Sequence, residues 1–274
     1  MKVYEIITNR IIEQLEKGEV PWHKPWIGGY PKNLISKKEY RGINTFILAS
    51  AHYISEYWVT YKQAKELGGN VKQGEHGWPV VFWKWLNVKD EKEEEKQVPM
   101  LRYYTVFNVC QCEGIKVPEK QIKENTPIQE CQNVISNFTD CPSIHDENRA
   151  VYYKDADTIG MPPINLFDSS EEFYSTLFHE VIHSTGHQKR LDREGIKDMV
   201  SFGSTNYSKE ELVAEMGAAF LCGLTGIENK TIDNSSAYIQ SWLKRLHDDK
   251  KFVIMAAAQA QKSVDYVLNK KYGE

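Results

Sequence analysis

The spacing of apolar positions predicts helices in the first part of the chain. In VYEIITNRIIEQLEKG, isoleucines and leucine recur at helical intervals from Ile6 to Leu15, and Gly18 supplies a stop. The segment VTYKQAKELGG has a similar helical pattern and ends at a glycine pair. A further short helix is expected near Thr45–Tyr53, after a proline- and glycine-rich stretch.

Two runs of β-branched and aromatic residues, WPVVFWKWLNVK and MLRYYTVFNV, predict a pair of strands. The charged run DEKEEEK between them is typical of a solvated hairpin loop. In the first strand, Trp83 and Trp85 share one face, whereas Phe82 and Lys84 share the other. We therefore expect one of the two aromatic sets to be buried.

The second half of the chain carries mainly helical patterns. QECQNVISNF begins a helix, AVYYKDADTIGMPP predicts two short strands or a strand and a turn, and SSEEFYSTLFHEVIHSTGH predicts a helix capped by Ser169 or Ser170. SKEELVAEMGAAFLCGLTG predicts a helix from a cap at Ser208 to Gly223 or Gly226. The tail from residue 235 onward predicts two more helices.

Length and composition divide the chain into two parts. The 274 residues are enough for two hydrophobic cores, and six of the seven tryptophans lie in the first 85 residues. A polar, charged stretch at residues 116–127 predicts a linker between an N-terminal domain (1–115) and a C-terminal domain (128–274). The predicted fold class is α+β, with a small α+β domain followed by a mainly helical one.

Bulk composition argues against a membrane or disulfide-rich protein. No apolar run approaches the roughly 20 residues needed to span a bilayer, and the N-terminus is unlike a signal peptide. We therefore expect a cytoplasmic protein without a membrane partner. The five cysteines have no regular framework and are expected to be reduced thiols, and CQC alone is a weak metal motif.

One segment differs in charge from the chain as a whole, which has a net charge of −4. Between Pro21 and Leu86, nine basic and four acidic residues give +5. Cations follow phosphates and aromatic rings stack on exposed bases, so this composition is typical of a surface for single-stranded DNA, although core packing of the rings is the alternative. The candidate DNA contacts are Trp26, Lys37, Lys38, Arg41, Lys62 and Lys72.

The segment LFHEVIHSTGH is a candidate metal site. On a helix, His179 and His183 lie on one face, where two imidazoles can bind one cation beside Glu180. A downstream helix offers Glu211 and Glu215, one turn apart, so one could bind the metal while the other supports a histidine. On spacing alone either acid could take either role. The competing interpretation is a helix pair whose polar side chains only hydrogen-bond in the core.

The motif differs from the metzincin pattern, because Lys189 stands where that class has its third histidine. We expect His187, two residues earlier, on the surface or beside a substrate. The pattern histidine, histidine, glutamate resembles the gluzincin metallopeptidases instead. This resemblance implies Glu211 as the third ligand, Glu215 as its supporting acid, and Glu180 as the general base toward water attacking a peptide carbonyl. It implies zinc, although these donors accept other divalent ions.

Taken together, the motifs of both halves resemble one family. PWHKPW, SKKEYRGIN and WVTYKQAKELGGNVKQGEHG resemble the N-terminal domain of ArdC-type antirestriction proteins, and LFHEVIHSTGH, YSKEELVAEMGAAFLCGLTGI and SAYIQSWLKRL resemble their zincin-like metallopeptidase domain. The resemblance implies a protein of a plasmid or other mobile element that binds single-stranded DNA and shields incoming DNA from host restriction. It also implies kinship of the N-terminal domain with conjugation-associated primases.

Two functions therefore stay open. In the first, an antirestriction protein binds DNA with its N-terminal half and carries a metal site in its C-terminal half. In the second, a metallopeptidase cleaves a specific host protein, and the N-terminal half only targets it to DNA. A purely structural zinc is disfavoured, because structural sites usually have four protein ligands and the chain offers three.

Overall fold

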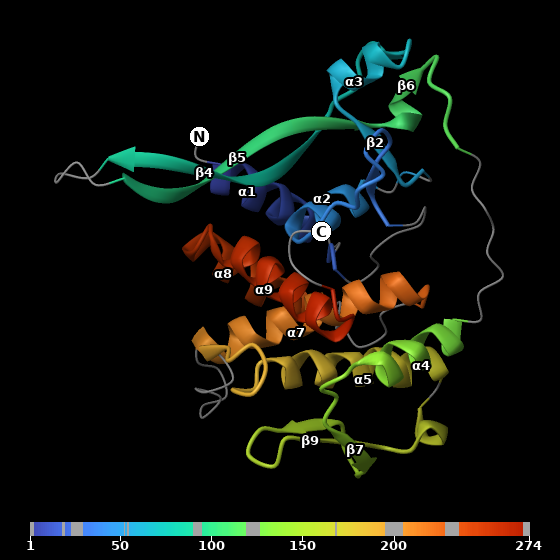
Figure 1. Cartoon of the computed structure of the whole chain (residues 1–274), viewed down its shortest axis with the longest axis vertical. Helices are drawn as coiled ribbons and strands as arrows, with labels where there is room; N and C mark the ends of the chain where they lie inside the picture. Colours follow the sequence, from blue (N-terminus) through green and yellow to red (C-terminus); the bar gives the residue numbers. More distant parts are fainter. Residues whose placement is uncertain are drawn as a thin grey trace.

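The computed structural model describes most of the chain. The described residues are 3–17, 20–22, 30–51, 53, 55–89, 95–118, 127–167, 169–194, 205–227 and 236–270. Figure 1 shows a sheet with short helices at one end, a layer of C-terminal helices in the middle, and a small sheet at the other end. Among the helices of these residues, none combines the length and the apolar character needed to cross a membrane.

The N-terminal half contains a four-stranded sheet in the order β1-β2-β5-β4 and a two-stranded sheet of β3 and β6. Only the β1–β2 pair of these sheets is parallel. The elements are α1 (Val3–Glu16), β1 (Lys32–Asn33), α2 (Ile43–Ala49), β2 (Tyr57–Val59), α3 (Tyr61–Glu66), β3 (Asn70–Val71), β4 (Trp78–Lys89), β5 (Glu95–Asn108), a 3₁₀ turn (Val109–Gln111) and β6 (Cys112–Glu113).

Local sequence accounts for these helices. The face of α1 that contains Ile7, Ile11 and Leu15 is buried, as its spacing predicts. Thr60 caps α3 by accepting a hydrogen bond from the backbone of Gln63, whose side chain accepts one from Thr60 in return. The three helices expected in this half are therefore confirmed.

Strands β4 and β5 form a long antiparallel ribbon, which confirms the predicted pair. Their register runs from Trp78 opposite Val106 to Lys89 opposite Glu95, and residues 90–94 lie outside the described part. The expectation that one aromatic set of β4 is buried is wrong for the rings that are described. Phe82 is 42% exposed and Trp83 is 44% exposed. The reason is that the ribbon extends past the helices that cover its base (Figure 1).

The described residues of the C-terminal half are mainly helical and include a three-stranded sheet in the order β7-β9-β8, in which β7 and β9 are parallel. Its elements are α4 (Pro127–Asn137), β7 (Ser143–Asp146), β8 (Val151–Tyr153), β9 (Thr158–Met161), a 3₁₀ turn (Ile164–Leu166), α5 (Ser170–Thr185), α7 (Thr205–Thr225), α8 (Ser236–Asp248) and α9 (Phe252–Val267). The two predicted strands and the predicted helices are present.

One predicted cap of this half is wrong. Helix α7 begins at Thr205, so Ser208 lies inside it rather than capping it. No proline or glycine stands between Thr205 and Ser208 to stop the helix there. At the other end α7 stops before Gly226, which has a φ of 80°, the left-handed conformation typical of a helix terminator.

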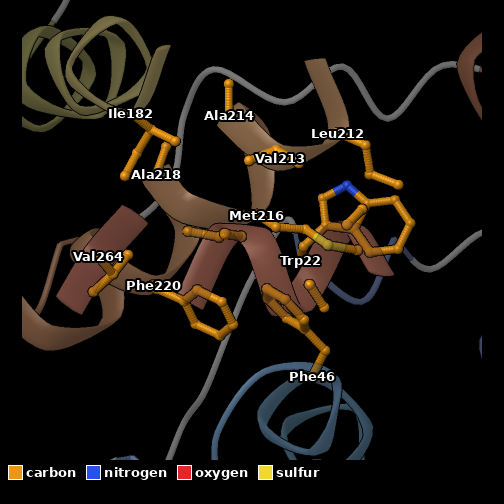
Figure 2. Close-up of a cluster of buried hydrophobic side chains, with 14 of the residues drawn as sticks. Trp22, Phe46, Ile182, Leu212, Val213, Ala214, Met216, Ala218, Phe220 and Val264 are labelled. Carbon is orange, nitrogen blue, oxygen red and sulfur yellow. The ribbon is translucent and has the colours of Figure 1, made fainter. Parts of the chain in front are cut away.

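The largest hydrophobic core runs through both halves, and two smaller clusters lie within the N-terminal half. It joins Ile7 and other residues of α1 to residues of α5, α7, α8 and α9. Figure 2 shows Trp22 and Phe46 of the N-terminal half packed against side chains of α7. The rings of Phe46 and Phe220 stack with centroids 4.5 Å apart, and Trp22 meets Trp242 edge to face at 6.2 Å. Helix α7 therefore packs directly against the N-terminal half.

Candidate metal centre

The histidine-bearing helix is well defined at both ends. Ser169 caps α5 by accepting a hydrogen bond from the backbone N–H of Glu172 at 3.1 Å, and Gly186 follows the last turn. His179 and His183 lie one turn apart on this helix, and their Nε2 atoms are 3.0 Å apart. Both rings thus direct the same nitrogen toward one point.

Helix α7 brings the third donor to this point. Its approach to α5 is close at Gly217, where an added Cβ would lie 2.8 Å from Ile182 side-chain atoms. Six residues upstream on α7, the Glu211 carboxylate lies 3.6 Å from His179 Nε2 and 3.5 Å from His183 Nε2. Donor atoms of the three residues all lie within 4.8 Å of one another.

These separations fit a single cation. A tetrahedral ion with bonds of about 2.0–2.1 Å holds its donors about 3.3 Å apart, close to the 3.0–3.6 Å between these atoms. Two imidazoles and one carboxylate are donors that zinc and several other divalent ions accept. Three protein donors also leave a coordination position for water or a substrate.

A buried ion pair between Glu210 and Arg193 lies on the Nδ1 side of the His183 ring. The Nδ1 atom of His183 lies 3.5 Å from Glu210 Oε1, long for a hydrogen bond, and has no well-formed partner among the described residues. A cation on Nε2 would fix the proton on Nδ1 and direct it toward Glu210. Glu210 in turn accepts hydrogen bonds from Nε and Nη2 of Arg193.

Arg193 is itself fully engaged. Its Nη1 donates to Thr185 Oγ1 at 2.6 Å and to Ser263 Oγ at 2.8 Å, and its Nη2 donates to the Ile182 carbonyl at 2.8 Å. A buried guanidinium with all of its donors used is held in one orientation. Arg193 therefore ties α5, α7 and α9 together beside His183.

The charged residues around the site shift the pKa values of His183 and Glu210. Burial opposes the charged form of His183, but Glu210, Glu211 and Glu180 outweigh burial and raise the pKa of His183 to about 9. Burial likewise opposes ionisation of Glu210, but the Arg193 charge outweighs it and lowers the pKa of Glu210. The pocket therefore favours positive charge, whether a proton or a metal ion.

The other two acids of the motifs lie nearby. Glu180 is buried on α5, between the two histidines in sequence, and its charge acts on His183. Glu215 lies one turn beyond Glu211 on α7, where its carboxylate accepts a hydrogen bond from the indole of Trp22 at 3.2 Å. Helix α7 is thus linked directly to the N-terminal half.

Comparison with known proteins places this geometry in a family. Residues 1–107 match the family profile described as the N-terminal domain of anti-restriction factor ArdC, and residues 130–259 match a zincin-like metallopeptidase profile. The crystal structure of metal-free ArdC from the R388 plasmid is 37% identical, with a TM-score of 0.79, and the match covers 99% of this chain and 100% of that one. The chain belongs to the ArdC antirestriction family.

Other relatives extend this comparison. The Mn(II)-bound structure of R388 ArdC matches with a TM-score of 0.78 and 37% identity over 98% of each chain. The protein y4eC of Sinorhizobium fredii is 31% identical over 97% of this chain and 91% of its own length. A DNA primase TraC of Escherichia coli is 32% identical over 97% of this chain, but the chain spans only 27% of that primase. The zincin-like domain of the family implies a divalent metal.

We expect His187 at the surface or beside a substrate, and the structure shows that it is not at the surface. It is buried after α5, where its Nδ1 lies 3.8 Å from Asp157 and accepts a hydrogen bond from the backbone of Lys189. Asp157 also binds Arg190 through two hydrogen bonds of 2.7 and 3.2 Å. His187 belongs to a polar cluster that joins the segment after α5 to the turn between β8 and β9.

Three of the six candidate DNA contacts lie between residues 26 and 38. Trp26 lies outside the described residues. Lys37 lies over the ring of Tyr57, with its Nζ 4.8 Å from the ring centroid, and Lys38 next to it is exposed. This pair of lysines forms part of a turn that follows β1.

The other three candidates have protein partners. Arg41 forms an ion pair with Asp265 on α9, which links the two halves. Lys62 lies 3.7 Å from Glu66 on the exposed face of α3, and Lys72 donates to the Cys110 carbonyl at 3.0 Å. Arg41 therefore has a structural role that its position in a basic segment did not suggest.

Sequence reasoning missed Glu210 and Arg193. Glu210 stands next to Glu211 in the sequence, but helical spacing directed attention to the pair at 211 and 215. Arg193 lies in a segment that has no regular pattern. Only the three-dimensional structure shows that these two residues form an ion pair next to His183.

Proposed function

We propose that this member of the ArdC family protects incoming DNA by combining single-stranded DNA binding with a hydrolytic metal site. The observation that carries the proposal is the convergence of His179, His183 and Glu211 from two helices, with Glu180 beside them. Zinc is the proposed metal because the donor set and the three-ligand arrangement suit it. We further propose Glu211 as the ligand and Glu215 as a supporting acid.

The residues of the site have distinct proposed roles. When bound, a divalent cation supplies Lewis-acid activation of water and of the oxygen under attack. His179 and His183 provide neutral Nε2 donors, and Glu210 stabilises His183 through its Nδ1 proton. The Glu180 carboxylate is the general base, which accepts a proton from water and passes it to the leaving group.

The DNA-binding part of the proposal rests on the N-terminal half. Its segment from Pro21 to Leu86 has a net charge of +5 in a chain of net charge −4. Relatives named for antirestriction and for a DNA primase support nucleic acid as the partner. A protein that protects incoming DNA acts in the cytoplasm, and we propose that this chain originates from a plasmid or other conjugative element. The proposed domains are residues 1–115 and 128–274, joined by residues 116–127.

A transfer assay tests the proposal. Unmodified plasmid DNA is introduced into restricting and non-restricting recipient cells, with and without the protein. The wild type should raise recovery in restricting cells alone, whereas no difference between the two recipients would contradict the proposed protection.

The substitution Glu180→Gln separates two versions of this function. It removes the proposed base but keeps the size of the side chain, and Glu171→Gln on the same helix is the matched control. Loss of protection with unchanged DNA affinity would show that hydrolysis is needed, and would favour cleavage of a host protein. Full protection by Glu180→Gln would show that DNA binding is sufficient.

A further inference from the structure

One face of the β4–β5 ribbon differs from the rest of the molecular surface. In an antiparallel pair, directly opposite residues point to the same side, and side chains alternate along each strand. Tyr104 lies opposite Val80, Arg102 opposite Phe82, and Met100 opposite Lys84. These six residues therefore share one side of the ribbon, which we call the outer face.

The base of the ribbon is fixed and its outer face is open. The side-chain amide of Asn44, in α2, exchanges two hydrogen bonds of 2.7 Å with the backbone of Val81, which holds β4 against the helices. On the outer face, Val80 is buried against the N-terminal core. Beyond it, Phe82, Lys84, Arg102 and Tyr104 are all exposed.

The exposed rings of this face lie together, with one cation beside them and another beyond them. Phe82 and Tyr104 are adjacent, with centroids 5.5 Å apart and planes at 54°. Arg102 lies directly opposite Phe82, and Lys84 is the next residue on the same side of β4 beyond Phe82. Among the described residues, neither cation forms an ion pair. Burial raises the pKa of Tyr104, so the phenol stays neutral beside them at physiological pH.

Two exposed rings beside two cations match a specific kind of partner. A polyanion that also presents flat apolar surfaces satisfies both features, and single-stranded nucleic acid has both. Duplex DNA hides the faces of its bases within the stack, and an acidic peptide offers charge without stacking surfaces. The spacing of same-face side chains, about 6.6–6.8 Å, also lets a strand lie along the ribbon.

We propose that the outer face of the ribbon is the platform on which single-stranded DNA stacks its bases, with Phe82 and Tyr104 contacting bases and Lys84 and Arg102 contacting phosphates. This inference rests on the proposed DNA-binding function and assigns it to a surface. None of these four residues was among the contacts expected from the sequence.

The opposite face of the same ribbon supplies a matched control. Trp83 and Tyr103 lie on it, are 44% and 48% exposed, and belong to the same two strands. Trp83 borders a cleft of about 260 Å³ between the ribbon and α9, which Ile254 and Lys262 also line. Substitutions on the two faces therefore remove similar aromatic surface from opposite sides of one element.

The test uses the full chain and a fluorescent oligo(dT) of about 16 nucleotides, in a salt series. Phe82→Ala combined with Tyr104→Ala should weaken binding at least about 20-fold. Trp83→Ala combined with Tyr103→Ala should change it by about twofold or less. Lys84→Ala with Arg102→Ala should reduce the slope of log affinity against log salt by about 1.4. Tyr104→Phe should keep wild-type affinity, because it keeps the ring.

The outcomes separate this inference from the function on which it rests. No salt-dependent binding by the wild type would contradict the DNA-binding function itself. Wild-type binding that is lost in the Trp83 and Tyr103 variant, but kept in the Phe82 and Tyr104 variant, would overturn the platform alone. Equal affinity for duplex DNA would also overturn it, since stacking needs unpaired bases. Thermal unfolding of each variant shows whether a loss of binding reflects a loss of folding.

Discussion

At the scale of single residues, the proposed ligand His183 lies beside a buried charge pair that is not itself among the proposed ligands. Arg193 and Glu210 are both buried, and each is the main charged partner of the other. Removing one partner leaves the other charge uncompensated in the interior, which makes such pairs sensitive to substitution.

Glu210→Ala should therefore lower the free energy of unfolding of the metal-free protein by about 3–5 kcal/mol. It should also weaken metal affinity by about 10- to 100-fold, because His183 loses the group that orients it. Urea unfolding and metal titration measure the two effects. Glu194→Ala, at an exposed neighbour of Arg193, is the control and should change neither quantity. Unchanged metal affinity in Glu210→Ala would show that His183 needs no such support.

The cluster around Asp157 gives a prediction for pH dependence. Burial alone would raise the pKa of Asp157, but hydrogen bonds from Arg190 and Tyr152 outweigh burial and lower it. A carboxyl whose pKa is lower in the folded state stabilises the protein above its unfolded pKa, about 3.9. That stabilisation disappears as pH falls through the folded-state pKa.

Asp157→Asn should therefore be less stable than the wild type near neutral pH, and the difference should shrink as pH falls below about 4. Urea unfolding at a series of pH values measures this difference. A stability difference that stays constant down to the lowest pH would mean that the carboxylate charge is not what Arg190 needs.

The residues of the site were unequally accessible to sequence reasoning. His179, His183 and Glu211 could be proposed because one-turn spacing on a helix is visible in the sequence. Arg193 could not be proposed, since its contacts reach α5, α7 and α9, and no local pattern encodes them. His187 was expected at the surface or beside a substrate, but it is buried next to Asp157, which lies 30 residues earlier in the chain.

At the scale of elements, the site depends on how closely α5 and α7 approach each other. Gly217 allows this approach, because any side chain there would meet Ile182. Figure 2 shows Ile182 beside Ala218 on α7, where small residues continue the contact surface. Glu211 reaches the histidines only because the two helices lie this close.

Gly217→Ala should destabilise the protein by up to about 2 kcal/mol, since an overpacking cost of about 1–3 kcal/mol is offset in part by the helix propensity gained, about 1 kcal/mol. Metal affinity should fall with it, because Glu211 moves away from the histidines. Adding Ile182→Ala should make the two stability changes less than additive, which a double-mutant cycle in urea detects. A gain of about 1 kcal/mol in Gly217→Ala alone would show that the helices have room.

Elements with a clear apolar pattern were predictable, and elements without one were not. The buried stripe of α1 and the alternating strands of the ribbon follow directly from periodicity. Strand β7 was missed, because all four of its residues are exposed and its pairing with β9 is a tertiary contact. The start of α7 was misplaced by three residues, since a serine inside a helix resembles a cap when only the sequence is known.

At the scale of the whole molecule, the largest hydrophobic core is shared by the two halves despite their different compositions. Phe46 stacks on Phe220, Arg41 pairs with Asp265, and the backbone N–H of Gly42 donates to Gln261 at 3.0 Å. The distribution of tryptophans distinguishes the two halves of the sequence, but it does not show whether their hydrophobic cores are separate. That property depends on contacts between distant segments.

Phe46→Ala should therefore destabilise both halves together, by about 3–5 kcal/mol. Tryptophan fluorescence, which reports mainly on the N-terminal half, and far-UV circular dichroism, which reports mainly on the helices, should shift to the same lower urea midpoint. Two separate transitions, with only the fluorescence transition shifted, would show that the halves unfold independently.

The most direct test of the proposed site is calorimetric titration of the metal-free protein with Zn²⁺ and with Mn²⁺. The wild type should bind one equivalent, Glu211→Gln should abolish saturable binding, and Glu215→Gln should retain it with a loss of at most about 100-fold. Both substitutions are isosteric and lie one turn apart on α7; Glu211 lies against both histidines, whereas Glu215 accepts a hydrogen bond from Trp22. Stoichiometric binding that survives in Glu211→Gln and disappears in Glu215→Gln, or no binding by the wild type, would contradict the assignment of His179, His183 and Glu211 as the metal ligands.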